Sequence, residues 1–260
     1  MTPPSNATVP PPTKDTEAGL WSPQLRNRRD VDVYLPPSYA DGRRHPVVYM
    51  HDGQNLTDPS TAFAGTWGLN EVLLRLAERR IEPIVVGIHN TKDRVSEYSP
   101  FPDSRLGGGS GDAYLSFIAD TIKPRIDRLY RTRRSAAHTA ILGSSMGGLI
   151  SLYAWFNRPD VFGSAGGLSP SLWFGRTRLF EYIESAAVPR GKRLYVDVGT
   201  AEGAGTLRDV RQLRSILRAR GVGRGVLSYL EDRGGRHNEA AWGRRVERAI
   251  ELLVRRQGVT

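Results

Sequence analysis

The chain of 260 residues contains no cysteine. This absence excludes disulfide bonds, zinc sites built from thiolates and a cysteine nucleophile. It is compatible with the cytoplasm, which is the location we expect. No apolar run reaches the roughly 18 residues that a membrane-spanning helix needs, so the sequence predicts no membrane partner.

The N-terminal segment lacks the features of a signal peptide. Residues 1–17 are rich in proline, threonine, serine and asparagine, and they contain no apolar core. Such a composition is typical of a disordered tail. We therefore expect a tail over residues 1–20 and one domain over residues 21–260, whose 39% hydrophobic content suits a single large α/β domain with a buried core.

The net charge of +10 arises from 37 basic against 27 acidic residues. A nucleic-acid-binding protein would be expected to gather its basic residues into one patch with interleaved aromatic side chains. Here the arginines are dispersed, and several recur at helical spacing opposite apolar positions, which indicates solvated helix faces and no nucleic-acid partner, with some attraction for anionic substrates or surfaces. These arginines are Arg79, Arg80, Arg131, Arg133, Arg134, Arg208, Arg211, Arg214, Arg218, Arg220, Arg244, Arg245, Arg248, Arg255 and Arg256.

The most informative pattern is Gly143-x-Ser145-x-Gly147, which ends an apolar run and opens a helical one. Strand, sharp turn and helix in this order form a nucleophile elbow, in which a Cβ atom at either glycine would collide across the turn. The serine hydroxyl is then raised above the sheet beside a helix N-terminus, which favours negative charge. The pattern predicts Ser145 as a nucleophile; the alternative is a glycine-rich turn with an incidental serine.

Strands and helices alternate along the chain, which predicts an α/β fold with a central, mostly parallel β-sheet flanked by helices. The polar loops follow the predicted strands, at the edge where open α/β sheets place their active sites. Helices are expected after the elbow and over residues 69–80, 113–130, 206–220 and 240–256. The helix over residues 113–130 is expected to be interrupted near Pro124. Strands are expected over residues 30–36, 46–50, 83–88, 138–142, 163–169, 194–199 and 225–230.

A serine nucleophile needs a base within hydrogen-bond reach and an acid that orients the base. Of the five histidines, only His237 lies beyond the elbow, in a glycine-bounded loop after a strand. It is the predicted base; the alternative is a surface loop histidine. Glu202 lies in the loop after a predicted strand, where this fold carries its acid, and is favoured over Asp197, Asp209 and Asp232.

The tetrahedral intermediate of acyl transfer needs two hydrogen-bond donors. One predicted donor is the backbone N–H of Met146, directly after the serine. The other is the backbone N–H of Gln54, in the loop after the third strand. Because this donor belongs to the main chain, the identity of the side chain at position 54 does not affect the prediction.

Aromatic residues on the same loops as the site residues are predicted to line a substrate pocket, with a place in the core as the alternative. They are Trp67, Tyr98, Trp173 and Trp242.

Metal and nucleotide sites find little support. His51 beside Asp52 has no further partner at ligand spacing, and no His-Glu-x-x-His is present, so we expect no metal and a structural role for this pair. The loop over residues 90–112 is long enough to be functional. Its run Gly107-Gly108-Gly109 follows no strand and precedes no Gly-Lys-Ser/Thr, so it is not a phosphate cradle.

Four segments together resemble the putative esterase family of α/β-hydrolases, over residues 30–254. This family groups esterase D-like proteins with enterobactin esterase-like enzymes, feruloyl esterases and mycolyltransferases. The segments are residues 48–55, Arg94 with Glu97 and Tyr98, residues 143–148 and residues 169–173.

The resemblance implies an α/β-hydrolase fold with little or no lid, and ester hydrolysis without a cofactor. Ser145 and His237 match the family's nucleophile and base, and Gln54 matches its second oxyanion donor. Glu202 matches the acid in Gly199-Thr200-Ala201-Glu202. Some siderophore esterases of this group work with a weakened or absent acid.

We therefore expect a serine carboxylesterase that acts on a small-molecule ester through Ser145, His237 and Glu202 and forms an acyl-enzyme. Acyl transfer to an alcohol or sugar by the same residues is one alternative. A non-catalytic hydrolase-like protein that binds anionic polymers is another. A siderophore lactone, a feruloyl or acetyl sugar ester and a short-chain acyl ester all fit the sequence, as does any oligomeric state.

Overall fold

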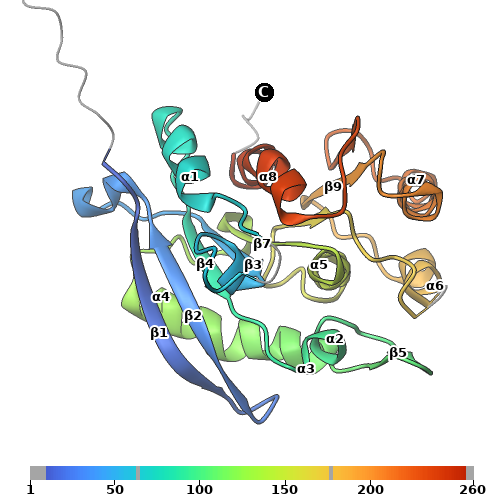
Figure 1. Cartoon of the computed structure of the whole chain (residues 1–260), viewed down its shortest axis with the longest axis horizontal. Coiled ribbons are helices and arrows are strands. Elements are labelled where there is room, and N and C mark those ends of the chain that lie inside the picture. Colours follow the sequence, from blue (N-terminus) through green and yellow to red (C-terminus); the bar gives the residue numbers. More distant parts are fainter. Residues whose placement is uncertain (1–9, 63–64, 176–177, 256–260) are drawn as a thin grey trace, which may run out of the picture.

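A computed structural model of the chain describes residues 10–62, 65–175 and 178–255. Its centre is an eight-stranded sheet in the order β1-β2-β4-β3-β7-β8-β9-β10 (Figure 1). The first two strands and β4 pair antiparallel, and the strands from β4 to β10 pair parallel, which confirms the mostly parallel sheet expected from the sequence. The strands are β1 (Thr13–Ser22), β2 (Asn27–Leu35), β3 (Val47–His51), β4 (Ile84–Ile88), β7 (Thr139–Ser144), β8 (Ser164–Leu168), β9 (Arg193–Gly199) and β10 (Leu227–Asp232).

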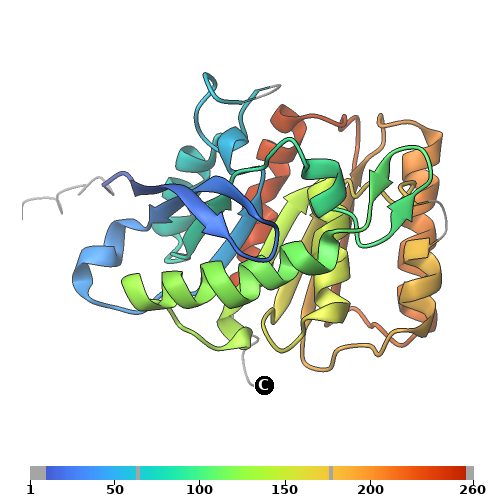
Figure 2. The same ribbon diagram turned by 90° about the horizontal axis from the view of Figure 1, so that it is seen from below.

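The segment before the elbow strand is helical throughout. It comprises α3 (Gly111–Ser116), a π-helical turn (Phe117–Ile122) and α4 (Lys123–Leu129), and Figure 2 shows it as one unbroken rod. The interruption expected near Pro124 is this wider turn. A proline inside an α-helix has no N–H to donate and crowds the carbonyl four residues earlier, and a π-helical turn before it relieves that clash.

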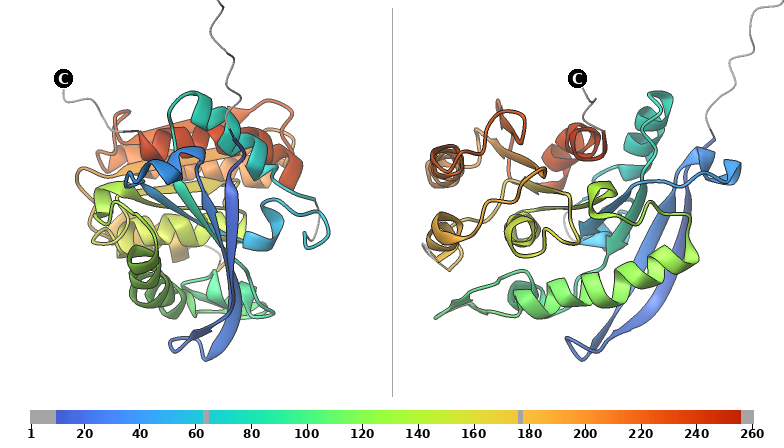
Figure 3. Two further views of the ribbon diagram at one scale, coloured as in Figure 1. Left: turned by 90° about the vertical axis from the view of Figure 1, so that its left-hand side faces the viewer. Right: turned by 180° about the vertical axis from the view of Figure 1, so that it is seen from behind.

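Helices cover both faces of the sheet (Figure 3). Within β3, Val48 and Met50 pack with α1 and α8, whereas Val47 and Tyr49 pack with the helices of the other face. This follows from the two-residue period of a strand and explains why the central strands read as continuous apolar runs. The remaining helices are α1 (Leu69–Glu78), α2 (Arg94–Glu97), α5 (Met146–Asn157), α6 (Arg178–Ser185), α7 (Ala204–Ala219) and α8 (Glu239–Val254).

The N-terminal expectation needs a correction. Residues 13–20, assigned to a disordered tail, belong to β1, which pairs with β2 on both sides of a bulge between Glu17 and Leu20. Backbone pairing at a sheet edge needs no apolar side chains, and polar contacts such as Thr16 Oγ1 to Asp32 Oδ1 (2.6 Å) hold the strand in register. Residues 1–9 lie outside the described residues, as does Arg256, to which the last helix was predicted to extend.

Several elements have no counterpart in the sequence prediction. They include α6 and, within the 90–112 loop, α2 and the short hairpin of β5 (Pro102–Asp103) and β6 (Gly107–Gly108). Within the described ranges, no helix combines the length and the apolar character of a membrane-spanning segment.

Candidate active site

The turn between β7 and α5 has the strained geometry of a nucleophile elbow. Ser145 adopts φ 55° and ψ −121°, a backbone region that residues other than glycine rarely occupy. A Cβ atom added to Gly143 would lie 2.8 Å from the carbonyl carbon of Gly147 and 2.7 Å from Cδ2 of His51. The Ser145 N–H donates to the Leu168 carbonyl (2.9 Å), which ties the turn to the neighbouring strand β8.

The structure brings Ser145, His237 and Glu202 together. His237 Nε2 lies 2.9 Å from Ser145 Oγ, and His237 Nδ1 lies 2.8 Å from Glu202 Oε2. In a neutral imidazole, Nδ1–H donates to the carboxylate and Nε2 accepts from the hydroxyl. The edge of the His237 ring packs on Trp242, with ring centroids 4.9 Å apart. The geometry is that of a nucleophile, a base and an acid in series.

Backbone hydrogen bonds fix the loop that carries His237 to the loop that carries Glu202. Because β9 and β10 are parallel neighbours, both loops leave the sheet at the same edge. The contacts run from the Thr200 N–H to the Asp232 carbonyl (2.9 Å) and from the Ala201 N–H to the Gly235 carbonyl (3.0 Å). The separation between His237 and Glu202 is therefore set by these backbone hydrogen bonds.

The Glu202 carboxylate is fully buried and fully hydrogen-bonded. Oε1 accepts from the Gly199 N–H (2.7 Å) and from Ser169 Oγ (2.5 Å), while Oε2 faces His237. Burial acts to raise the pKa of Glu202, but the hydrogen bonds from His237, Ser169 and Gly199 outweigh it, and the pKa lies below its ordinary value. The carboxylate is therefore ionised at neutral pH.

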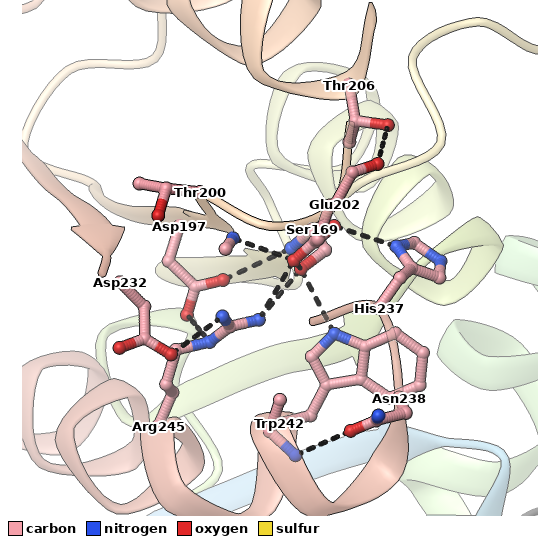
Figure 4. Close-up of polar contacts among 12 residues, drawn as sticks. Ser169, Asp197, Thr200, Glu202, Thr206, Asp232, His237, Asn238, Trp242 and Arg245 are labelled. Atoms are coloured by element: carbon pink, nitrogen blue, oxygen red, sulfur yellow. Dashed lines mark hydrogen bonds and ion pairs between the residues drawn. The ribbon is translucent and has the colours of Figure 1, made fainter. Parts of the chain in front are cut away.

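Arg245 lies behind Glu202 and requires a correction. Its sequence neighbours suggested a solvated helix face, but its side chain is 3% exposed. Its guanidinium contacts Ser169 Oγ (Nη2, 2.8 Å), Asp197 Oδ2 (Nε, 3.2 Å) and Asp232 Oδ2 (Nη1, 3.2 Å), as Figure 4 shows.

The other acids considered from the sequence lie elsewhere. Asp197 accepts from the Ser169 N–H (3.2 Å) and from Tyr195 Oη (2.9 Å), and burial raises its pKa to about 7. Asp232 pairs with Arg245, and Asp209 pairs with Arg208 on α7. Of the four candidates, Glu202 is the one that the structure places against His237 Nδ1.

The predicted oxyanion donors lie on adjacent strand ends. Met146 is the first residue of α5, so its N–H has no acceptor within the helix. Gln54 lies in a 3₁₀ turn (Gly53–Asn55) after β3, and β3 pairs with β7. In the described parts of the chain, no backbone acceptor is found for the Gln54 N–H, whereas its side-chain oxygen accepts from the Asn90 N–H (3.2 Å).

Ser145 and His237 open into a cleft of about 650 Å³. An ion pair between Arg94 Nε and Asp52 Oδ1 (2.7 Å) forms part of its wall. Glu239 is buried there, which raises its pKa. Within residues 90–112, only Asn90 and Arg94 line the cleft, so this loop does not close over Ser145. The lining is mostly polar: Asp52, Gln54, Asn55, Thr61, His89, Asn90, Arg94, Ser144, Ser145, His237, Glu239 and Trp242.

Two of the predicted pocket residues are core residues instead. Trp67 is 3% exposed and packs against Trp242, and Tyr98 is fully buried and accepts from the Asp52 N–H (3.2 Å). Neither residue lines the cleft, because both rings pack into the interior behind the strand ends. Trp242 does line it. Trp173 is 54% exposed and lies outside the cleft lining, so its contact with substrate stays a prediction.

His51 supports the elbow from below. Its Nε2 donates to Ser151 Oγ (3.1 Å), which donates to the Gly147 carbonyl (2.8 Å), and its Nδ1 accepts from Tyr114 Oη (2.8 Å). Burial lowers the pKa of His51 to about 3, so the ring is neutral. Among the described residues, no group of three or more metal-ligating side chains is placed to hold an ion.

Sequence reasoning missed a second hydroxyl beside that of Ser145. Ser171 Oγ lies 3.0 Å from Ser145 Oγ, and the Ser171 N–H donates to the Ser145 carbonyl (3.0 Å). Its position in Ser169-Pro170-Ser171, directly after a small-residue strand, was the available signal.

Known proteins are similar to this chain in sequence or in fold. The uncharacterised protein YbbA of Bacillus subtilis is 28% identical over 249 residues, which are 90% of this chain and 96% of YbbA. The iron(III) salmochelin esterase of Escherichia coli O6:H1 is 30% identical over 230 residues, or 82% of this chain and 51% of that protein. The crystal structure of the BES protein from Bacillus cereus matches with a TM-score of 0.76 at 18% identity, over 94% of this chain and 96% of that one, which shows a shared fold.

The family model described as Putative esterase matches residues 22–251, a range that includes the elbow, the acid loop and the histidine loop. Family membership supports ester hydrolysis as the activity. The fold is that of the α/β-hydrolases, and the chain belongs to the Putative esterase family.

Proposed function

We propose that the chain is a serine carboxylic-ester hydrolase in which Ser145 is the nucleophile, His237 the base and Glu202 the acid. The observation that carries this proposal is the hydrogen-bonded series from Ser145 Oγ through His237 to Glu202, at 2.9 and 2.8 Å. The strained backbone of Ser145 supports it, because strain of this kind persists where a side chain must be presented in one direction.

In the acylation step, Ser145 Oγ attacks the ester carbonyl carbon while His237 Nε2 takes the hydroxyl proton. The Met146 and Gln54 N–H groups donate to the carbonyl oxygen as it becomes an oxyanion, and donors of this kind each contribute about two to three orders of magnitude in rate. The intermediate collapses as the carbon–oxygen bond to the leaving group breaks. His237 returns the proton to the leaving alkoxide, and an acyl-enzyme remains.

In the deacylation step, water takes the place of the serine. His237 accepts a proton from the water as its oxygen attacks the acyl carbon, and the same two N–H groups stabilise the second oxyanion. Collapse breaks the bond to Ser145 Oγ, which recovers its proton from His237. The ionised Glu202 stabilises the imidazolium that forms in both steps.

Solvent access favours hydrolysis over acyl transfer. The His237 side chain is 37% exposed, and the 90–112 loop does not cover the nucleophile, so water can reach the acyl carbon. An acyltransferase must keep water away from its acyl-enzyme. The complete set of reacting residues likewise favours an enzyme over a non-catalytic scaffold. The cytoplasmic location and the absence of nucleic-acid and membrane partners stay predictions.

The cleft favours a polar ester as substrate. Its wall presents amide, guanidinium and carboxyl groups, and Trp242 is the one tryptophan, tyrosine or phenylalanine among the described lining residues. Such groups bind an ester whose acyl or alcohol part carries hydroxyl or amide functions, and they would lose hydration without compensation against a long alkyl chain. One similar protein is named an iron(III) salmochelin esterase, so siderophore esters belong in the first substrate panel.

The test is hydrolysis of p-nitrophenyl acetate and butyrate by the wild type and by Ser145→Ala, together with labelling by an alkyl phosphonate and intact-mass measurement. Ser215→Ala on the exposed face of α7 is the matched serine control. We expect turnover and one adduct in the wild type and the control, and neither in Ser145→Ala. Wild-type turnover in Ser145→Ala, or no turnover by folded wild type, would refute the proposal.

A further inference from the structure

The acid side of the site rests on a buried cluster of charges (Figure 4). The side chains of Glu202 and Asp197 are both fully buried, and that of Asp232 is 29% exposed. These carboxylates come from a loop and two neighbouring strands, and Arg245 of α8 reaches all three of them. Buried carboxylates without a cation are costly, so this arginine offsets the cost of keeping Glu202 ionised beside the other two carboxyl groups.

Arginine suits this position better than lysine does. Its planar guanidinium donates from Nη1 to Asp232 and from Nη2 to Ser169, while Nε lies 3.2 Å from Asp197 Oδ2 as an ion pair without a hydrogen bond. One ammonium group cannot reproduce this planar arrangement. Asp197 is also held by Tyr195, and Glu202 by His237, so these groups, with Arg245, are the titratable neighbours of the cluster. Arg248 acts on Tyr195 from the next turn of α8.

Ser169 links Arg245 to Glu202 and thereby orients the Glu202 carboxylate. Its backbone has φ 45°, and its N–H donates to the Asp197 carbonyl of β9 (3.0 Å), which fixes its position beside that strand. Its oxygen accepts from Arg245 Nη2 (2.8 Å) and from Trp242 Nε1 (3.1 Å). A hydroxyl oxygen has two acceptor sites and one proton. With both acceptor sites taken, the proton is directed at Glu202 Oε1, 2.5 Å away.

The consequence reaches the reacting atoms. With Oε1 held by Ser169 and by the Gly199 N–H, the Glu202 carboxylate turns Oε2 toward His237 Nδ1. The Arg245 guanidinium itself lies 3.5 Å from Oε1 and favours the ionised form of the acid. Arg245 contacts neither the nucleophile nor the cleft in the described structure, so its effect passes through Ser169 and Glu202.

We propose that Arg245 is a positioning residue for ester hydrolysis, which orients and keeps ionised the Glu202 carboxylate through the hydroxyl of Ser169. This inference rests on the proposed function of Ser145, His237 and Glu202. It assigns to α8 a role in catalysis besides its contribution to the core.

The test compares Arg245→Met with Arg245→Lys, and uses Arg244→Met, an exposed neighbour on the same helix, as control. We expect Arg245→Met to lower kcat by about 10- to 100-fold with little change in KM, less than the loss of the acid itself. Removing a positive charge beside Glu202 favours proton uptake by its carboxylate, so the acid limb of the pH–rate profile should move to higher pH. Arg245→Lys should recover part of both effects, and Arg244→Met should match the wild type.

A second variant separates positioning from folding. Arg245→Met with Asp197→Asn removes the cation together with one buried carboxylate, so less uncompensated charge remains in the interior. This double variant should fold and still show the displaced acid limb. Ser169→Ala keeps the Arg245 cation and removes the hydroxyl that links it to Glu202. This variant should lower kcat and move the acid limb less than Arg245→Met does.

One readout needs no turnover. The proton of His237 Nδ1, hydrogen-bonded to a carboxylate, gives a downfield resonance, which His237→Ala would assign. We expect it to shift or broaden in Arg245→Met and to stay in Arg244→Met. An unchanged resonance and acid limb in folded Arg245→Met would overturn the inference, even if activity fell with stability. Absent turnover and labelling in the wild type would instead refute the proposed function.

Discussion

The hydroxyl oxygen of Ser171 lies 3.0 Å from the hydroxyl oxygen of Ser145. In the proposed mechanism His237 Nε2 accepts the proton of Ser145, which makes Ser171 the donor in this contact. The Ser145 hydroxyl is then held from two sides, by the proposed base and by a neighbouring hydroxyl that fixes its rotamer. Only the first of these contacts is needed for proton transfer.

Ser171→Ala should therefore lower kcat/KM only modestly. Losing one neutral hydrogen bond costs about 1 kcal/mol, which corresponds to about a five-fold loss. Initial rates with p-nitrophenyl acetate, set beside those of Ser145→Ala, measure this. A loss of about a thousand-fold or more would place Ser171 among the reacting groups and contradict the secondary role given to it here.

The two elbow glycines should differ in their tolerance of alanine. At Gly143, a Cβ would lie 2.7 Å from His51 Cδ2 and 2.8 Å from the Gly147 backbone, whereas at Gly147 its nearest neighbour would be His51 Cβ at 3.1 Å. Overpacking of this kind costs about 1–3 kcal/mol or more. In urea unfolding, Gly143→Ala should be destabilised clearly more than Gly147→Ala.

Gly205 provides the control for that comparison. It lies in α7, and a Cβ added there meets nothing within 4 Å. Gly205→Ala should raise the free energy of unfolding by about 0.4–1 kcal/mol, because alanine loses less backbone entropy on folding. Equal destabilisation of Gly143→Ala and Gly147→Ala would show that the elbow relaxes around either methyl group.

The parts of this site that could be predicted from the sequence are those carried by local patterns. Ser145 and its glycines form a continuous motif, and His237 is the one histidine after it. The expectation of Glu202 followed from its place after a strand. The central strands could be predicted because burial on both faces demands continuous apolar runs. Apart from the choice of His237, these signals lie within a few consecutive residues.

The parts that could not be predicted depend on contacts between distant segments. Arg245 resembles Arg244 and Arg248 in sequence, and its burial is decided by carboxylates on two strands. Trp67 and Tyr98 stand in loops that the fold turns inward. The strand β1 is polar and exposed, so its pairing with β2 leaves no apolar pattern to read.

The buried His51 should make stability fall as the pH is lowered. In the folded protein its pKa is about 3 against an ordinary 6.5. Between these values the unfolded chain binds a proton that the folded chain does not, so stability rises with pH across this window and is lost toward its acid end. One such group contributes at most about 1.4 kcal/mol per pH unit.

His51→Gln should remove that contribution. Glutamine keeps an N–H group that can reach Ser151 Oγ but takes up no proton, so the variant should be less stable at pH 7 and should show a flatter dependence of unfolding free energy on pH. Urea titrations of both proteins across the acid range measure the difference. Parallel curves would show that His51 is protonated in the folded protein, contrary to its burial.

The roles of the two buried carboxylates on the acid side of the site should separate in Glu202→Gln and Asp197→Asn. Glu202 faces His237 Nδ1, and an amide in its place favours the wrong tautomer of the imidazole. Glu202→Gln should therefore lower kcat by about 10³- to 10⁴-fold with KM nearly unchanged. Asp197 instead faces Arg245, Ser169 and Tyr195. Because its pKa is about 7, it is already partly protonated near neutral pH.

Asn at position 197 imitates that protonated form and can still accept from the Ser169 N–H, so Asp197→Asn should lose less than about ten-fold in kcat. Steady-state kinetics of both variants at pH 7 and pH 8.5 provide the measurement, with circular dichroism to verify folding. A thousand-fold loss in Asp197→Asn beside a small one in Glu202→Gln would reverse the assignment. It would mean that the acid loop rearranges when substrate binds, so that the strand carboxylate reaches His237.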